Sequence, residues 1–260
     1  MIRAGDECER RKRLALLVEA RRMWRAPASE EAAGLLRIQS AWCNAAIEGN
    51  PLTWGQVLGI ARRETRAEDR HAREMLSCLC AAEFLEDAPE VMTLPLIRHL
   101  HALVMEGLGT GPGMLRDREV KIVKESGPEA GRAVFHPPHP ARVRELLEDL
   151  LTTLDQDSED PLLQAGRFHY EFQSIHPFED GNGRVGRLLT TWLAGRGWDS
   201  AGFHLEPSIR RWGPGYYLAL RAVRSDYEDQ GAHGLDPWLL PFLDMSADAL
   251  LNPPPLEEME

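Results

Sequence analysis

Residues 176–187 read HPFEDGNGRVGR. The tripeptide Gly181–Gly183 tolerates left-handed backbone angles, so its successive N–H groups can turn towards one point and form a nest for an anion. A helix is predicted directly after it, and the N-terminus of a helix offers unpaired N–H donors and a partial positive charge that suit phosphate. Arg184 and Arg187 add two guanidinium groups on one face of that helix. The stretch therefore predicts a phosphate-binding loop.

The other face of the predicted helix is apolar. Its apolar side chains follow the i, i+3, i+4, i+7, i+8 spacing of a helix that packs on a core, and they are Val185, Leu188, Leu189, Trp192 and Leu193. At about 100° per residue this stripe lies roughly opposite the two arginines. We therefore expect one face of the helix to pack into a core and the cationic face to meet a ligand.

Two side chains before the helix would complete a reaction. Asp180 precedes the glycine nest, and a carboxylate beside phosphates is the usual protein ligand of Mg²⁺. His176 carries an imidazole, which titrates near neutral pH and can accept a proton from an attacking hydroxyl. Phe178 lies between them and is expected to be buried as an anchor for the loop. Together these parts predict phosphoryl or nucleotidyl transfer.

Each part alone also has an ordinary structural interpretation. Gly-Asn-Gly is a common turn, an Asp before Gly serves turn geometry, and two arginines on a helix commonly face solvent. It is their combination within residues 176–187 that favours a site.

The rest of the chain limits the classes of function. The chain has 260 residues and a net charge of -11, whereas general nucleic-acid binding needs a basic face. No run approaches the ~18 apolar residues that span a bilayer, and the N-terminus lacks the pattern of a signal peptide. We expect a cytoplasmic protein with no nucleic-acid or membrane partner, whose four cysteines are reduced thiols.

The periodicity along the chain is mainly helical. Helices are predicted over residues 9–24, 29–47, 54–63, 67–86, 93–106, 140–154, 160–174, 184–196, 214–226 and 236–250. Between them, residues 119–123 and 133–135 flank a turn-rich stretch and predict the only β-hairpin. The expected fold is all-α, a helical bundle with a short β-hairpin. We divide it into an N-terminal helical region (1–92), a core (93–200), and C-terminal helices (201–260) that complete the same globular unit.

The stretch at 176–187 resembles the HPFx[D/E]GNGRxxR signature of the Fic family and matches it at every fixed position. Further resemblances lie at Pro112–Arg116 (PGMLR) and at Arg167–Ser174 (RFHYEFQS), which is similar to the helix that leads into the motif. The predicted hairpin resembles the Fic flap, and Tyr216 and Tyr217 resemble a tyrosine pair near the adenine pocket. The resemblance runs from about residue 36 to residue 245.

This resemblance implies an activity, namely transfer of AMP from ATP to a Ser, Thr or Tyr hydroxyl of a target protein, with release of pyrophosphate. The target would dock at the flap by strand addition, and the chain could pair as a homodimer. His176 would be the base and Asp180 would position Mg²⁺. The phosphates would be held by Gly181, Asn182, Gly183, Arg184 and Arg187.

A possible brake lies upstream, where residues 44–49 read NAAIEG. They resemble the family's inhibitory pattern [S/T]xxxE[G/N], with Asn44 in the place of Ser or Thr. A Glu48 carboxylate paired with Arg187 would occupy the group that should bind the γ-phosphate. The ordinary interpretation is that Glu48 ends a helix and Gly49 caps it. With the signature present downstream, we favour the inhibitory interpretation.

Two other functions stay open. The chain could be a hydrolase that removes AMP, with Glu48 orienting a water molecule. It could also be a catalytically silent regulatory module with the same fold. His101 and His169, which fall on predicted helices, are expected to be packed or surface residues rather than ligands.

Overall fold

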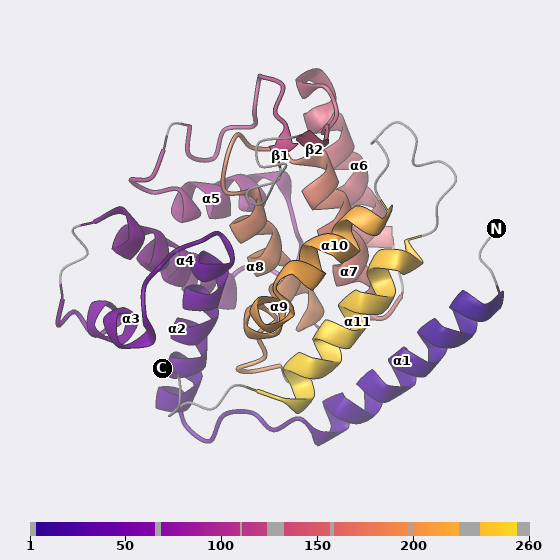
Figure 1. Cartoon of the computed structure of the whole chain (residues 1–260), viewed down its shortest axis with the longest axis horizontal. Coiled ribbons are helices and arrows are strands. Elements are labelled where there is room, and N and C mark those ends of the chain that lie inside the picture. The colour runs from indigo at the N-terminus through magenta and orange to yellow at the C-terminus, as the bar shows by residue number, and fades with distance from the viewer. Residues whose placement is uncertain are drawn as a thin grey trace.

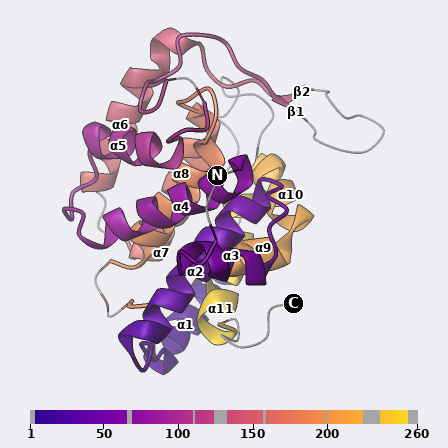
Figure 2. The ribbon, with the colours of Figure 1, turned by 90° about the vertical axis from the view of Figure 1, so that its left-hand side faces the viewer.

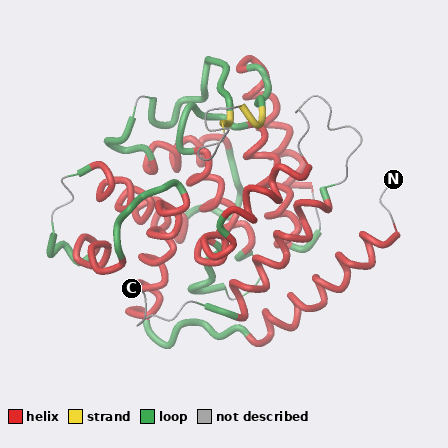
Figure 3. The backbone as a smooth tube through the Cα atoms, in the orientation of Figure 1, coloured by secondary structure: helices red, strands yellow, loops and turns green. Residues whose placement is uncertain are grey.

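The computed structural model describes residues 4–65, 69–109, 111–123, 133–156, 159–196, 198, 200–223 and 235–253. Figures 1 and 3 show helices throughout this part of the chain and strands only in one short hairpin. The elements in chain order are α1 (Ala4–Met23), α2 (Glu30–Ile47), α3 (Trp54–Ala61), α4 (Arg70–Glu86), α5 (Leu94–Val104), β1 (Ile122–Val123), β2 (Ala133–Phe135), the 3-10 helix η1 (Pro140–Arg142), α6 (Val143–Gln156), α7 (Pro161–Ile175), α8 (Asn182–Ala194), α9 (Glu206–Trp212), α10 (Pro214–Val223) and α11 (Asp236–Leu251). The predicted all-α fold is confirmed.

Polar side chains at the helix starts explain several boundaries. Ser29, Thr93 and Asp160 each accept a hydrogen bond from a backbone N–H in the first turn of the helix that follows. Such caps satisfy N–H groups that have no partner inside the helix. Proline stands in the first turn of α5 and of α7, where its missing N–H costs nothing. These starts agree with the sequence prediction.

The prediction missed one helix and misplaced several boundaries, of which the start of α8 bears on the site. Helix α9 was not predicted, since seven residues with two arginines and a proline carry little periodic signal. Helix α8 begins at Asn182, two residues before the predicted start, because Gly181 takes a left-handed conformation with φ 78° and caps it. The Asn-Gly pair that suggested a turn thus forms the first turn of the helix.

Helix α8 lies at the centre of the fold, in contact with α2, α4, α5 and α7. Helix α1 runs along α11 at the lower edge of the molecule in Figure 1. One apolar cluster joins Leu17 of α1, Leu100 of α5, Leu189 of α8 and Trp238 of α11. Of the predicted apolar stripe on α8, Trp192 alone is only partly buried. Elements from the beginning, middle and end of the chain therefore share one core.

The hairpin projects from the helices, as Figure 2 shows. Its strands are antiparallel, with Ile122 opposite Phe135 and Val123 opposite Ala133. The predicted hairpin is therefore confirmed, while its turn at residues 124–132 lies outside the described residues.

Two further expectations concern membranes and thiols. Within the described ranges, no helix is both long and apolar enough to cross a membrane. All four cysteines are free thiols. Burial raises the pKa of Cys43 to about 11 and that of Cys78 to about 12, which keeps both protonated at neutral pH.

Candidate active site

His176 ends helix α7 and turns the chain into the loop. Its backbone is left-handed, with φ 49° and ψ 62°, and its N–H donates to the carbonyl of Phe172 at 3.0 Å. In the described chain only Arg63 among the other non-glycine residues has a positive φ. An imidazole residue held in a rarely populated conformation indicates a constrained site.

Arg116 fixes this turn through hydrogen bonds to backbone carbonyl groups. Its buried guanidinium donates to the carbonyl oxygens of His176 at 2.8 Å, Arg118 at 3.0 Å and Pro138 at 2.5 Å, and its backbone N–H donates to Pro177 O at 2.9 Å. Burial lowers the pKa of Arg116. The sequence placed Arg116 in a motif without giving it a task. In the fold it joins the base of the hairpin to the turn at His176.

His101 holds the next part of the loop. Its ring stacks on the buried ring of Phe178, with centroids 3.7 Å apart and planes 3° apart. Its Nδ1 accepts the N–H of Gly113 at 2.8 Å, so its Nε2 carries the proton and donates to Asp180 O at 3.0 Å. Burial lowers the pKa of His101 to about 4, so the ring is neutral at neutral pH. Of the two expected placements, packed or at the surface, His101 takes the packed one, and its hydrogen bond to the loop was not predicted.

Asn182 also supports the loop from within. Its side-chain oxygen accepts the N–H of Phe178 and its side-chain nitrogen donates to Phe178 O, both at 2.9 Å. Because Asn182 and Gly183 are the first residues of α8, their backbone N–H groups have no partner inside the helix. Any anion bound by this tripeptide would therefore be held by its backbone.

The carboxylate of Glu48 lies at this anion site. Glu48 caps the C-terminus of α2, and its Oε1 accepts a hydrogen bond from Arg187 Nη2 at 2.6 Å. The same oxygen lies so close to Gly183 that a Cβ there would overlap it. The Glu48 side chain is 29% exposed, whereas that of Arg187 is 1% exposed. A negative group from α2 thus lies over the positive end of α8.

Asn44 fixes the same arginine from one turn earlier on α2. Its Oδ1 accepts from Arg187 Nε at 2.7 Å, and its Nδ2 donates to the carbonyl of Arg184 at 3.1 Å. Burial lowers the pKa of Arg187, but Glu48, followed by Tyr216 and Tyr217, outweighs burial and leaves that pKa raised. Arg187 therefore stays charged, and each of its hydrogen bonds to α2 involves a cation.

The cationic face of α8 is covered by the N-terminal helices in this structure, so both arginines meet side chains of the same chain where a ligand is expected. Arg187 lies beneath α2, and Arg184 is ion-paired with Glu74 of α4. Buried arginines need carboxylate or carbonyl partners, and the N-terminal helices supply them. The α8 sequence alone gives no sign of that cover.

Asp180 remains open to solvent, with its side chain 62% exposed. Its Oδ1 accepts the N–H of Gly181 at 2.6 Å. In the ranges that the structure describes, no three His, Cys, Asp or Glu residues gather as a metal cage. A lone carboxylate beside a phosphate site suits Mg²⁺, which keeps most of its waters and takes its other ligands from phosphate.

The two tyrosines have different surroundings. Tyr216 is buried, and its hydroxyl lies 2.8 Å from His169 Nε2. Tyr217 donates to Ile47 O at 3.2 Å and lines a cleft of about 510 Å³. The other walls of this cleft include the end of α2 at Ala46 and Ile47, the hairpin strand β1, and the side chains of Arg210 and Arg221. An apolar slot therefore lies next to the anion site, with Tyr217 rather than Tyr216 on its wall.

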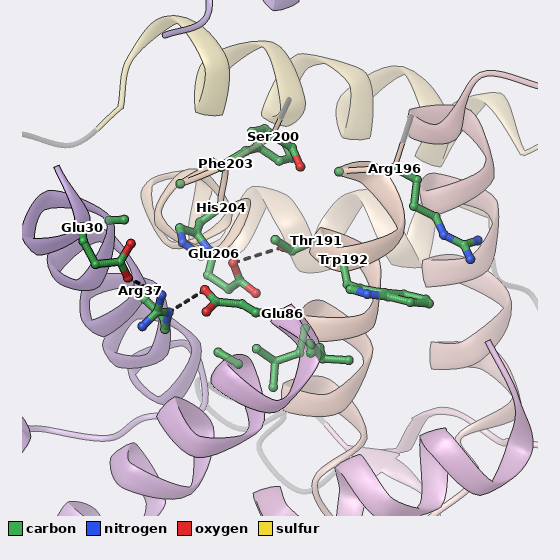
Figure 4. Close-up of a pocket in the computed structure, with 17 residues that line it drawn as sticks. Glu30, Arg37, Glu86, Thr191, Trp192, Arg196, Ser200, Phe203, His204 and Glu206 are labelled. Carbon is green, nitrogen blue, oxygen red and sulfur yellow. Dashed lines mark hydrogen bonds and ion pairs between the residues drawn. The ribbon is translucent and has the colours of Figure 1, made fainter. Parts of the chain in front are cut away.

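A second hollow, of about 480 Å³, lies beside α8 and is shown in Figure 4. Its wall includes the buried carboxylate of Glu206, whose Oε2 accepts from Ser40 Oγ at 2.8 Å and from Thr191 Oγ1 at 3.1 Å. Burial raises the pKa of Glu206. Ser40 lies one turn before Asn44 on α2, and Thr191 lies one turn after Arg187 on α8. Glu206 thus clamps the two helices together beside the Asn44–Arg187 contact.

Comparison with known sequences finds a family match over the residues of the site. Residues 91–194 match the model of the Fic/DOC family. A curated relative, protein adenylyltransferase fic-1 from Caenorhabditis elegans, is 30% identical over 156 residues, which cover 55% of this chain and 29% of the relative. The match therefore spans less than a third of that relative's length.

Solved structures show the same fold over nearly the whole chain. A Fic family protein from Desulfovibrio desulfuricans G20 has a TM-score of 0.81 and 28% identity, and the match covers 94% of this chain and 73% of that one. The C. elegans Fic-1 structure has a TM-score of 0.68 and 23% identity, with 95% and 71% covered. IbpAFic2 covalently tethered to Cdc42 has a TM-score of 0.56 and 13% identity, with 91% and 70% covered. At these identities the last two show the fold alone.

Proposed function

Because the chain belongs to the Fic/DOC family, we propose that it is a protein adenylyltransferase, which moves AMP from ATP to a hydroxyl side chain of a target protein. The observation that carries the proposal is the anion site at the start of α8. There the Glu48 carboxylate is hydrogen-bonded to Arg187 and lies against Gly183, in the first turn of the helix, whose N–H groups have no partner within the helix. A site that attracts a carboxylate so closely is suited to phosphate.

The nucleotide would lie across two neighbouring parts of the surface. Its phosphates would take the N–H groups of Gly181–Gly183 and the guanidinium of Arg187. Its base would enter the cleft beside Tyr217, whose far wall is β1. The end of α2 borders both parts: Ala46 and Ile47 line the cleft for the base, and Glu48 lies at the site for the phosphates.

His176 would act as the general base. It would take the proton of the target hydroxyl as that oxygen forms a bond to the α-phosphorus of ATP. The bond from this phosphorus to the oxygen shared with the β-phosphorus breaks, and pyrophosphate leaves. The left-handed backbone of His176, held by Arg116 at 2.8 Å, fixes the direction from which the imidazole approaches. Fixed placement of this kind is the main protein contribution to such transfers.

Asp180 is the residue that would hold Mg²⁺. Its carboxylate is exposed and lies at the edge of the anion site. The bound ion would neutralise charge on the phosphates as pyrophosphate departs. His101 would keep this carboxylate in place by holding the Asp180 carbonyl at 3.0 Å.

The target would be a protein segment that adds to the hairpin. In the described part of the chain the hairpin is a two-stranded sheet, and an extended peptide can add to the edge of such a sheet through main-chain hydrogen bonds. IbpAFic2, which shares the fold, has been solved tethered to a protein, Cdc42. That precedent supports a protein substrate here and gives no indication of which one.

Glu48 would inhibit the enzyme by occupying the site of the γ-phosphate. With Glu48 bound, Arg187 offers its charge to a carboxylate of the same chain, and the γ-phosphate of ATP meets a like charge instead of a free cation. ATP could enter with its phosphates displaced, which would prevent in-line attack. Displacement of the last turn of α2 would then switch the site on.

Two forms of labelled ATP would test the reaction. We expect the Glu48→Gly variant to retain label from the α-phosphate of ATP on protein, and no label from the γ-phosphate. Adding His176→Ala should reduce that labelling by about 10²-fold or more, the usual contribution of a general base. Transfer of γ-label, or full labelling without His176, would reject the proposal.

Removal of AMP would be a distinct reaction of the same site. Water, oriented by Glu48, would attack the phosphorus of the AMP-modified target; the bond from that phosphorus to the target oxygen would break, releasing AMP and the free target hydroxyl. Incubation of an AMP-modified target with wild-type protein in the absence of ATP separates the two directions. Release of AMP that requires Glu48 would favour the hydrolase over the transferase.

A further inference from the structure

Arg184 is held by a residue that lies outside the signature. Its Nη1 donates to Glu74 Oε1 of α4 at 2.5 Å, and the two side chains are 4% and 13% exposed. Its Nη2 lies 3.4 Å from Met105 Sδ and 3.4 Å from Asp180 Oδ1. The guanidinium therefore lies beneath the loop, between one close carboxylate and one more distant carboxylate.

Glu74 is itself fixed by the segment that carries the brake. Its Oε2 accepts from Asn50 Nδ2 at 2.9 Å, and the same nitrogen donates to His71 O at 2.9 Å. Gly49 has φ 88°, a turn that sends Glu48 towards Arg187 and Asn50 towards Glu74. The tripeptide Glu48–Asn50 thus reaches both arginines of α8, one directly and one through Glu74.

The two contacts differ in how readily they could break. Glu48 is partly exposed at the end of a helix, so its carboxylate can move into water. Glu74 lies in the second turn of α4 with both oxygens bonded, and separating a buried ion pair leaves a charge without a partner. Arg184 should therefore stay with Glu74 when Glu48 leaves Arg187.

The Glu74–Arg184 ion pair determines whether the Asp180 carboxylate is available. With Glu74 in place, the charge of Arg184 is largely balanced, and Asp180 keeps an exposed carboxylate at a loose 3.4 Å. Without Glu74, Asp180 would be the only carboxylate bonded to Arg184 and would be drawn to it. A guanidinium bonded to the carboxylate would repel a cation bound to the same group, so Asp180 would hold Mg²⁺ less well.

We propose that Glu74 is a positioning residue, which retains Arg184 beneath the loop and so leaves the Asp180 carboxylate free for Mg²⁺. The inference rests on the proposed function only in assigning Mg²⁺ to Asp180. It also assigns the two arginines different tasks: Arg187 binds the phosphate that Glu48 mimics, and Arg184 sets the loop.

Calorimetric binding of a non-hydrolysable ATP analogue to the Glu48→Gly protein tests this inference without turnover. Mg²⁺ should strengthen that binding. Adding Glu74→Gln should raise the Mg²⁺ concentration needed for the same strengthening by about tenfold, the scale for residues that orient a ligand, and leave binding without Mg²⁺ unchanged. Glu74→Asp, which keeps the charge, should recover part of the loss. Glu83→Gln, at an exposed acid on the same helix, should match the parent.

Other outcomes would overturn the inference. An unchanged Mg²⁺ requirement in Glu74→Gln would remove the positioning role. Equal loss of binding with and without Mg²⁺ would mean that Glu74 supports only the fold or that Arg184 contacts the nucleotide. If Glu74→Gln does not fold, Asn50→Ala should show a smaller shift in the same direction, and no shift there would count against the proposal. A Glu48→Gly protein that binds Mg²⁺ and the analogue normally but transfers no AMP would reject the proposed reaction alone.

Discussion

Asn44 stands where the inhibitory pattern has Ser or Thr, and its amide performs two tasks at once. The oxygen accepts from Arg187 and the nitrogen donates to the carbonyl of Arg184. A hydroxyl can also accept and donate, but it is shorter. The substitution therefore keeps the chemistry of the position and extends its reach to both residues of α8.

Asn44→Ala should weaken the brake without abolishing it. Arg187 Nε would lose its acceptor, at a cost of about 1–3 kcal/mol, while the Glu48 contact would remain. We expect AMP labelling between those of wild type and Glu48→Gly, with Asn44→Ser closer to wild type. Asn252→Ala, at an exposed helix end, serves as the control. Labelling by Asn44→Ala at the wild-type rate would show that Asn44 does not support the brake.

The residues of the site divide by how far their partners lie along the chain. His176, Asp180 and Arg187 were proposed as a group because they stand in one short motif, and the contact of Glu48 with Arg187, 139 positions apart, was expected only from the family resemblance. His101, Arg116 and Glu74 stand outside that motif, and their contacts span 60 to 110 positions. No local spacing encodes such contacts.

Among the elements, α5 supports the loop through one buried histidine. The His101 ring must be neutral to accept from Gly113 while it donates to Asp180 O. Its folded pKa of about 4 lies below the ordinary value of 6.5, so the unfolded chain binds the proton more tightly. The stability from neutral His101 is complete above pH 6.5 and is lost as the pH falls towards 4.

The measurement is the free energy of unfolding at pH 7 and pH 5. Wild type should lose about 2 kcal/mol more than His101→Gln over this interval, because the amide has nothing to titrate there. His204, whose pKa burial also lowers to about 4, is present in both proteins and cancels in the difference. Parallel pH profiles for the two proteins would mean that His101 is not held neutral.

Elements could be predicted where periodicity or caps are strong. The long helices and the hairpin were predicted, and Thr93 and Asp160 marked their helix starts. The short α9 was missed, although it carries Glu206, which binds Ser40 and Thr191. Its position depends on packing against α2 and α11, which are distant in sequence and meet only in the assembled fold.

At the scale of the whole molecule, the helix that carries the proposed brake is part of the core. Helix α2 packs on α4, α8 and α9, and Ala41 and Ala45 on its inner face are fully buried. Removing α2 as a unit would expose that surface, whereas moving only the end at Glu48 would not. The switch is therefore expected to be a local change at the end of α2, within a fold that otherwise stays intact.

The rate of AMP labelling in wild type and in Glu48→Gly, at equal ATP and Mg²⁺, tests the central claim most directly. Asp87→Gly, an exposed acid that caps the end of α4, is the matched control. If Glu48 occupies the phosphate site, Glu48→Gly should label at least about tenfold faster than wild type, since each 1.4 kcal/mol of lost competition is a factor of ten. The control should label at the wild-type rate. Equal labelling by wild type and Glu48→Gly would contradict the account.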